Sequence, residues 1–476
     1  LQYEHSQIMT GTLGDILMSI PTVVAKTVLA EWLELDSLAR LDSAYCNSGH
    51  REDILKMLKS LRHIFDVAES TNPAVGSTEL LKWLMKKGLK VSNAKFSTDT
   101  PFEVFHPFIK YSGLCLQSVE LFGIVCDEAM YHLTSILAEC CPNLISINAL
   151  CCAFPPHSWN DALKKCTKLT RLMFDCMAPV APDASIFSGV SLPHLQTIAL
   201  SGDGLTDDIT LAIVKTSPNI RTLSLVGTTN LSDLGIVAIA TQCPNLRAFG
   251  LTNVVLLHQG TVEAVVEACP HIVHLNLGYN TCLSDDAVLY AARHLKLQSL
   301  CLDDSMLLTN DLLLDMRELV GPTLTTLYLN NCPGLEPYSI VDLVRSCPLL
   351  HTLSIGGEDE CGDIFRSCFL QALSIYAPAL TTLLLDGDNL RDRHLISVAE
   401  YFPKLQHFGA LSPRNIKKGI SLVVECGAGL QLLTVKNQKD QRFRDLWLLM
   451  NPKLRICDLD SSDIGFHHFD VLTAEV

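Results

Sequence analysis

Three stretches of the chain repeat one another: Ser217–Leu225 reads S-P-N-I-R-T-L-S-L, Cys243–Leu251 reads C-P-N-L-R-A-F-G-L, and Cys269–Leu277 reads C-P-H-I-V-H-L-N-L. Each follows the register L-x-x-L-x-L, which places a short strand with one buried face in every unit. The register returns about every 26 residues, and a fixed period of this length predicts a solenoid of stacked repeats. The first aliphatic positions are Leu144, Leu169, Leu195, Ile220, Leu246, Ile272, Leu297, Leu324, Leu350, Leu380, Leu405, Leu430 and Leu454.

Composition limits the classes of function. Apolar residues make up 48% of the chain, but they are spread through the repeats rather than gathered in one run long enough for a membrane helix. The net charge of −15 argues against binding to nucleic acid and favours a partner with a basic surface. The 19 cysteines recur at repeat positions rather than as a secreted disulfide framework. This usage predicts reduced thiols in the cytoplasm or nucleus, without membrane association.

Proline and cysteine positions indicate the class of repeat. Proline stands two residues before the first aliphatic in most units, where it would end a helix and lead into a strand. Cysteine stands one residue earlier, at Cys141, Cys166, Cys243, Cys269 and Cys347. The pattern resembles the cysteine-containing class of leucine-rich repeats, which is associated with F-box receptors. The resemblance implies an α/β fold, a curved leucine-rich-repeat solenoid (horseshoe) of about 13–15 repeats.

The polar residues of the repeat are expected to be structural. Thr206, Ser232, Ser284 and Thr309 begin Ser/Thr-Asp or Ser/Thr-Asn pairs at predicted helix starts, where their hydroxyls are expected to cap the helix. A second set lies eight residues beyond the first aliphatic and is expected to bond the loop backbone of the next repeat. This second set consists of Cys152, Thr228, Asn280, Ser305 and Cys332.

Residues 20–47, ahead of the repeats, predict two short amphipathic helices that are too small to form a core alone. Their order of Ile20-Pro21, aliphatics, Trp32-Leu33, Ser37-Leu38 and Tyr45-Cys46 resembles an F-box. An F-box docks a substrate receptor onto the adaptor of a cullin–RING ubiquitin ligase. The resemblance implies that the adaptor binds Ile20, Pro21, Val24, Val28, Leu29, Trp32, Leu33, Leu38 and Leu41. The alternative is a helical cap that shields the first repeat.

The predicted organisation has five parts: an N-terminal tail (1–19), an F-box-like module (20–58), a helical linker or cap (59–88), the repeat solenoid (89–460) and a C-terminal cap or tail (461–476). Helices are predicted at Ile54–Phe65 and Glu79–Lys87, and early strands at Leu89–Phe96 and Leu116–Leu121. No motif for nucleophilic catalysis, phosphate binding or metal ligation occurs, so we expect no enzyme activity, no metal and no cofactor.

The residues between the strand leucines should face the inner surface of the solenoid, because side chains alternate along a strand. In the middle repeats these positions carry aromatic and hydrogen-bonding side chains that suit protein recognition. The predicted substrate-binding residues are His274, Asn276, Tyr279, Asp303, Asp304, Tyr328, Asn330 and Asn331. The resemblance therefore implies a substrate-recognition subunit of an SCF-type ubiquitin ligase. The other hypothesis is a repeat scaffold or inhibitor with no ligase role.

Overall fold

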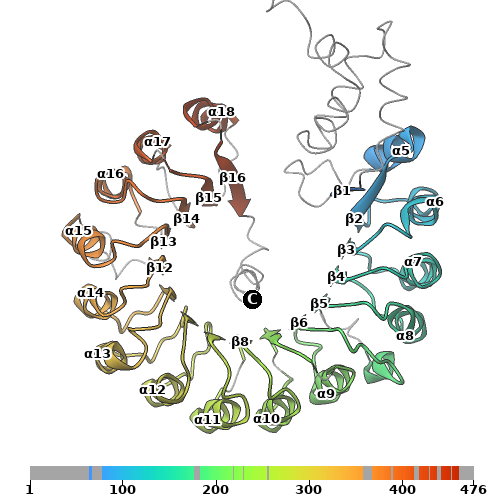
Figure 1. Ribbon diagram of the computed structural model, residues 1–476, viewed down its shortest axis with the longest axis horizontal. Coiled ribbons are helices and arrows are strands. Elements are labelled where there is room, and N and C mark those ends of the chain that lie inside the picture. The colour runs from blue at the N-terminus through green and yellow to red at the C-terminus, as the bar shows by residue number, and fades with distance from the viewer. Residues whose placement is uncertain are drawn as a thin grey trace, which may run out of the picture. The chain divides into compact units, whose positions relative to one another are not determined.

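A computed structural model of the chain describes residues 64–66, 78–175, 183–217, 219–228, 230–254, 257–357, 367–387, 390–411, 417–427, 429–436, 441–451 and 453–459. The chain forms two compact units, Leu1–Leu195 and Gln196–Val476. In both units parallel strands follow one another in chain order, and a helix lies between most successive strands (Figure 1). The predicted leucine-rich-repeat architecture is confirmed in these residues.

The first unit begins its sheet with a strand that the sequence did not predict. Its strands are β1 (Ile64–Asp66), β2 (Lys90–Ser97), β3 (Ser118–Phe122), β4 (Ser146–Leu150) and β5 (Arg171–Asp175). Its helices are α5 (Thr78–Lys87), α6 (Phe102–Ser112), α7 (Asp127–Cys140), α8 (Pro156–Lys165) and the 3-10 helix η3 (Ala184–Phe187). The prediction of a helix through Phe65 was wrong at this end, because Ile64 and Phe65 pair with Lys90 and Val91 as parallel strands.

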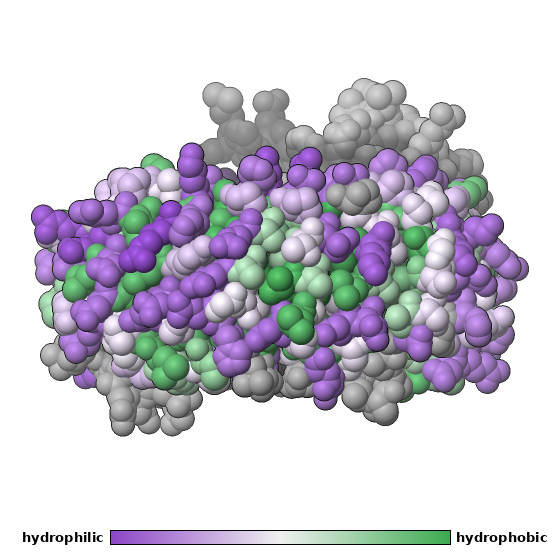
Figure 2. All heavy atoms as spheres, turned by 90° about the horizontal axis from the view of Figure 1, so that it is seen from below, coloured by the Kyte–Doolittle hydropathy of each residue, from purple (hydrophilic) through white to green (hydrophobic). Residues whose placement is uncertain are grey.

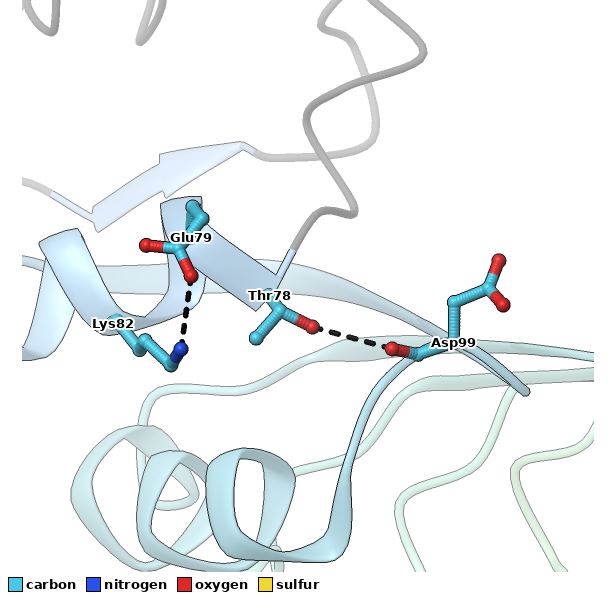
Figure 3. Close-up of polar contacts among 4 residues, drawn as sticks. All are labelled: Thr78, Glu79, Lys82 and Asp99. Carbon is cyan, nitrogen blue, oxygen red and sulfur yellow. Dashed lines mark hydrogen bonds and ion pairs between the residues drawn. The ribbon is translucent and has the colours of Figure 1, made fainter.

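Helix α5 confirms the helix predicted over Glu79–Lys87. At its start, Lys82 Nζ lies 2.9 Å from Glu79 Oε1, and the Thr78 hydroxyl donates to the carbonyl of Asp99 at 3.3 Å (Figure 3). The second contact joins α5 to the loop that follows β2, so it connects consecutive repeats. The predicted adaptor-binding residues, from Ile20 to Leu41, and the predicted C-terminal cap lie outside the described residues.

The second unit contains the regular repeats. Its strands are β6 (Thr197–Ser201), β7 (Thr222–Val226), β8 (Ala248–Thr252), β9 (His274–Asn276), β10 (Ser299–Cys301), β11 (Thr326–Asn330), β12 (Thr352–Gly356), β13 (Thr382–Asp386), β14 (His407–Ala410), β15 (Leu432–Lys436) and β16 (Arg455–Leu459). Its helices are α9 (Asp207–Lys215), α10 (Asp233–Gln242), α11 (Gln259–Ala268), α12 (Asp285–His294), α13 (Asn310–Leu319), α14 (Pro337–Arg345), α15 (Ser367–Tyr376), α16 (Asp392–Tyr401), α17 (Lys417–Cys426) and α18 (Gln441–Met450). Within this unit the strands line the inner side of an arc and the helices its outer side (Figure 1).

The strand register forms the core. Leu223, Phe249, Leu275, Leu300 and Leu327 are consecutive partners in the parallel ladder, and all are buried between the sheet and the helices. Side chains on alternate strand positions therefore face the inner side of the arc. This alternation gives every repeat the same set of inward-facing positions.

The repeat cysteines stabilise the bends between helix and strand. Cys269 follows α11 directly, and its thiol donates to the carbonyls of Ala240 and Cys243 in the preceding repeat, at 3.3 and 3.4 Å. Burial raises the pKa of Cys243 and Cys269 to about 12, so both thiols stay protonated. These cysteines act as small buried hydrogen-bonding side chains.

The helix starts are joined between repeats, which corrects the predicted capping. The Thr309 hydroxyl does not cap α13; it donates to Asp285 Oδ2 at 2.6 Å, while its backbone N–H donates to Asp285 Oδ1 at 3.0 Å. Ser232 makes the same pair of bonds to Asp207, at 2.6 and 2.9 Å, and also caps α10. Thr206 and Ser284 make no side-chain cap. In both cases the aspartate at the first position of one helix accepts hydrogen bonds from the residue that precedes the next helix.

Of the polar residues eight beyond the first aliphatic, Asn280 and Cys332 bond the preceding repeat rather than the next one as predicted. Asn280 Nδ2 donates to Leu251 O at 2.6 Å, and its Oδ1 accepts from the N–H of Val254 at 2.8 Å, both in the preceding repeat. The thiol of Cys332 likewise donates to Leu302 O at 3.1 Å. Cys152 bonds its own strand end, Leu150 O, at 3.2 Å, and the hydroxyls of Thr228 and Ser305 are buried without a hydrogen-bond partner.

Candidate functional site

A distinct backbone position follows each strand, seven residues beyond the first aliphatic. In most of the described repeats the chain turns there into the left-handed region, and the residue's N–H points toward the strand end of the next repeat. Several repeats use glycine, including Gly123, Gly202 and Gly227, as this conformation favours. The N–H of Gly227, for example, donates to Thr252 O at 2.9 Å.

Four consecutive repeats place side chains at this position instead of glycine. Asn253, Tyr279, Asp304 and Asn331 have φ values of 55°, 61°, 55° and 50°, and we call these four residues the rim. A left-handed backbone costs an L-residue roughly 1–2 kcal/mol, although Asn and Asp tolerate it best. Tyr279 gains no such tolerance from its side chain. The rim therefore carries side chains that the backbone conformation disfavours.

A buried polar network lies beside the rim, one residue earlier in each repeat. Asp303 Oδ1 accepts from the Asn330 backbone N–H at 2.7 Å, and Asp303 Oδ2 accepts from Asn330 Nδ2 at 3.0 Å. Asn330 Nδ2 also lies 2.8 Å from the Ser354 hydroxyl, so the network extends over three repeats. Because Asp303 is only 1% exposed, its carboxylate depends on these protein donors for its hydrogen bonds.

The electrostatics of this network are unusual. Burial raises the pKa of Asp303 to about 7; the Asp304 and Asp386 carboxylates add to the rise, and the bonds from Asn330 oppose it. Burial also raises the pKa of the Tyr279 hydroxyl far above its ordinary value, and Asp303 and Asp304 raise it further. The Tyr279 hydroxyl consequently stays protonated. It lies in the electrostatic field of the Asp303 and Asp304 carboxylates.

Asp386 reaches this cluster across the sheet because of a glycine. A Cβ on Gly356 would lie 1.8 Å from the carbonyl oxygen of Asp386, so only glycine allows the backbone at the end of β13 to approach β12 this closely. Asp386 is half-buried, and its Oδ1 atom is buried without a hydrogen-bond partner. Asp386 was not among the predicted site residues, although it occupies the repeat position of Asp303.

The predicted substrate-binding residues do gather on neighbouring strands, but at two depths. His274, Asn276 and Tyr328 are 4%, 4% and 8% exposed, and Asp303 and Asn330 are similarly buried. Tyr279, Asp304 and Asn331 are half-buried at the rim, where Asn331 Nδ2 donates to Asp304 Oδ1. The buried residues therefore form a floor, and the rim presents the more accessible groups. The sequence prediction also missed Asn253, which is exposed and aligns with Tyr279 when the repeats are superposed in register.

The outer, helical side shows a mixed surface. Around α11, hydrophilic and hydrophobic side chains are interspersed (Figure 2). Within the described ranges no group of three or more His, Cys, Asp or Glu residues could hold a metal ion. Among the same residues, no helix is long and apolar enough to cross a membrane.

No protein-family model and no curated protein matched the sequence. Solved structures resemble the chain. Yeast Rad7, in its complex with Elc1, shares 12% identity over 91% of this chain and 100% of that chain, with a TM-score of 0.43. The leucine-rich-repeat protein LegL7 of Legionella pneumophila shares 13% over 66% and 90%, with a TM-score of 0.34. LIC12759 of Leptospira interrogans shares 14% over 85% and 97%, with a TM-score of 0.35. Values this low assign no function, so the functional argument depends on the chain's own residues.

Proposed function

We propose that the protein is the substrate-recognition subunit of an SCF-type cullin–RING ubiquitin ligase. It binds a target protein on the inner face of its repeats and binds the ligase adaptor through residues 20–47. It performs no chemistry, and its contribution is proximity, because it holds the target where the ligase can transfer ubiquitin.

The rim is the observation that carries the recognition part of this proposal. Strained backbone that folding does not require indicates function when it clusters on one surface. Gly202 and Gly227 show that the repeat needs no side chain at this position. Cys151 gives the contrast, since it shares the left-handed conformation but uses its thiol structurally, donating to Asp175 Oδ2 at 3.2 Å. Repeats with consecutive side chains at this position present a row to a partner.

The ligase part of the proposal is supported by the F-box-like residues Ile20–Cys46 and by their position ahead of cysteine-containing repeats. The competing function is a repeat scaffold whose N-terminal helices serve only as a cap. The two differ in whether Trp32, Leu33 and Leu38 remain available to a partner or are buried by the first repeats.

Co-purification of the full chain with the purified ligase adaptor tests the proposal. The variant Leu33→Asp/Leu38→Asp should lose the adaptor, whereas Leu234→Asp, which makes the same chemical change at a leucine that is 82% exposed on α10, should retain it. Circular dichroism checks that each variant is folded. If the wild-type chain binds no adaptor, the ligase role is wrong. The same assay with Elc1, which forms a complex with yeast Rad7, tests a second candidate partner.

The recognition surface is tested separately with Asp304→Gly/Asn331→Gly. Glycine suits the left-handed backbone, so this variant should stay folded and keep the adaptor while it loses its target proteins. If this variant binds its target proteins as wild type does, the rim is not the recognition surface.

A further inference from the structure

The inner face of the second unit has a one-sided charge. Along β7–β14, the inward-facing positions carry no Lys or Arg in the described residues, whereas Asp303 and Asp386 follow or end strands there and Asp304 lies at the rim. Burial is the main cause that opposes the ionisation of Asp303, and the negative charges of Asp304 and Asp386 add to it. A partner that supplies positive charge would relieve this repulsion.

Buried polar atoms on the same face also lack a hydrogen-bond partner. Asp386 Oδ1 accepts none, although it is buried. The hydroxyl of Thr252, which directly precedes the rim residue Asn253, is likewise unpartnered, and Thr252 is only 3% exposed. Buried polar groups are normally hydrogen-bonded, so a donor that binds the Asp386 carboxylate would stabilise a charge that burial disfavours. A carboxylate oxygen accepts only, so the ligand group at Asp386 must be a donor.

Tyr279 adds an aromatic ring beside these acceptors. The tyrosine is half-buried, its backbone is held in the left-handed region, and the charges of Asp303 and Asp304 help to raise the pKa of its hydroxyl. An aromatic ring flanked by carboxylates attracts cations through both the ring and the charges. Guanidinium and ammonium groups combine positive charge with several donors.

We propose that the rim, together with Asp386, recognises a segment of the target protein that carries arginine or lysine side chains. The inference rests on the proposed function in one respect, that the inner face is the recognition surface. It names the chemistry of the target: cationic side chains that pair with the half-buried carboxylates of Asp304 and Asp386 and lie against Tyr279. Arginine fits this arrangement better than lysine, because its planar fork can donate to two acceptors at once.

Selection from a random peptide library on the immobilised full chain tests this directly. Arginine and lysine should be enriched among the peptides that bind wild type, and the enrichment should disappear with Asp304→Asn/Asp386→Asn. The matched control is Asp208→Asn/Asp286→Asn, which removes the same charge from exposed acids at the starts of α9 and α12 and should keep the enrichment. Enrichment that is absent with wild type, or equal in the two double variants, would overturn the proposal.

A selected peptide then allows a second measurement by fluorescence anisotropy. Replacing its arginines with citrulline keeps the shape and removes the charge. Since a hydrogen bond to a charged group contributes about 1.5–3 kcal/mol, each arginine that pairs with a carboxylate should weaken binding roughly 10- to 100-fold when it is replaced. An unchanged affinity would overturn the cationic assignment.

The outcomes are separable from those of the adaptor experiment. Basic peptides that bind a chain with no affinity for the adaptor would support this inference and refute the ligase role. A chain that binds the adaptor, but selects peptides without basic residues, would support the ligase role and refute this inference.

Discussion

Replacing Asp303 with asparagine should change how the stability of the protein depends on pH. The folded-state pKa of Asp303 is raised to about 7 from its ordinary value of 3.8, because burial disfavours the charged form. The folded state therefore binds this proton more tightly than the unfolded state. The stability linked to the group is fully present below the unfolded pKa and is lost as the pH rises toward 7.

The size of the effect follows from the two pKa values. One unit of pKa difference corresponds to about 1.36 kcal/mol, so between pH 5 and 8 the ionisation of Asp303 should cost the wild-type fold about 2.5 kcal/mol. The side chain introduced by Asp303→Asn cannot ionise, and its amide can keep the network intact if the Asn330 amide rotates to offer its oxygen. The free energy of unfolding of Asp303→Asn, relative to wild type, should therefore rise by this amount over that pH range.

Urea unfolding at several pH values measures this difference, and other titrating groups cancel because they are common to both proteins. Tryptophan fluorescence and circular dichroism should be followed on the same samples, since repeat arrays can unfold in stages. Asp208→Asn, which removes an exposed carboxylate from the start of α9, provides the control. A stability difference between Asp303→Asn and wild type that is independent of pH would refute the reasoning.

Three further predictions concern the backbone, the helix starts and the thiols. Tyr279→Gly should abolish target binding, yet it should lower the free energy of unfolding by less than its lost contacts imply, because about 1–2 kcal/mol of backbone strain is released. In urea unfolding, Tyr279→Ala should therefore have a lower free energy of unfolding than Tyr279→Gly. Asp285→Ala should lower the free energy of unfolding, measured in urea, by about 1–3 kcal/mol, because Thr309 loses both of its hydrogen bonds to Asp285. Asp286→Ala should change this free energy little, and equal losses in the two variants would contradict the role of Asp285. At pH 8 the buried Cys243, with a pKa of about 12, should resist a thiol reagent that labels the exposed Cys282, as peptide mass spectrometry would show; equal labelling would argue against burial.

The leucine register was predictable because it is a local pattern repeated many times. Leu275 and Leu300 could be assigned to the core from their period alone, and the structure places both there. The cap predicted at Ser232 is confirmed, whereas the one predicted at Thr309 was wrong because the decisive contact, Thr309 with Asp285, joins residues in different repeats. A local pattern identifies a hydroxyl suited to capping, but it does not show that an acid of the preceding repeat binds the hydroxyl first.

The candidate site was predictable in its location and not in its depth. Strand alternation places the side chains of His274 and Tyr328 on the inner face, but it does not show that both are buried. Asp386 was missed because its proximity depends on the close backbone approach at Gly356. The left-handed conformation of Tyr279 could have been suspected only by aligning it with Gly202 and Gly227 in the repeat.

Native mass spectrometry of the full chain mixed with the ligase adaptor and a selected arginine peptide tests the central claim most directly, because it reads both binding surfaces at once. We predict one particle that contains the chain, the adaptor and the peptide. Leu33→Asp/Leu38→Asp should lose only the adaptor, and Asp304→Asn/Asp386→Asn should lose only the peptide. A folded wild-type chain that carries neither partner would contradict the account.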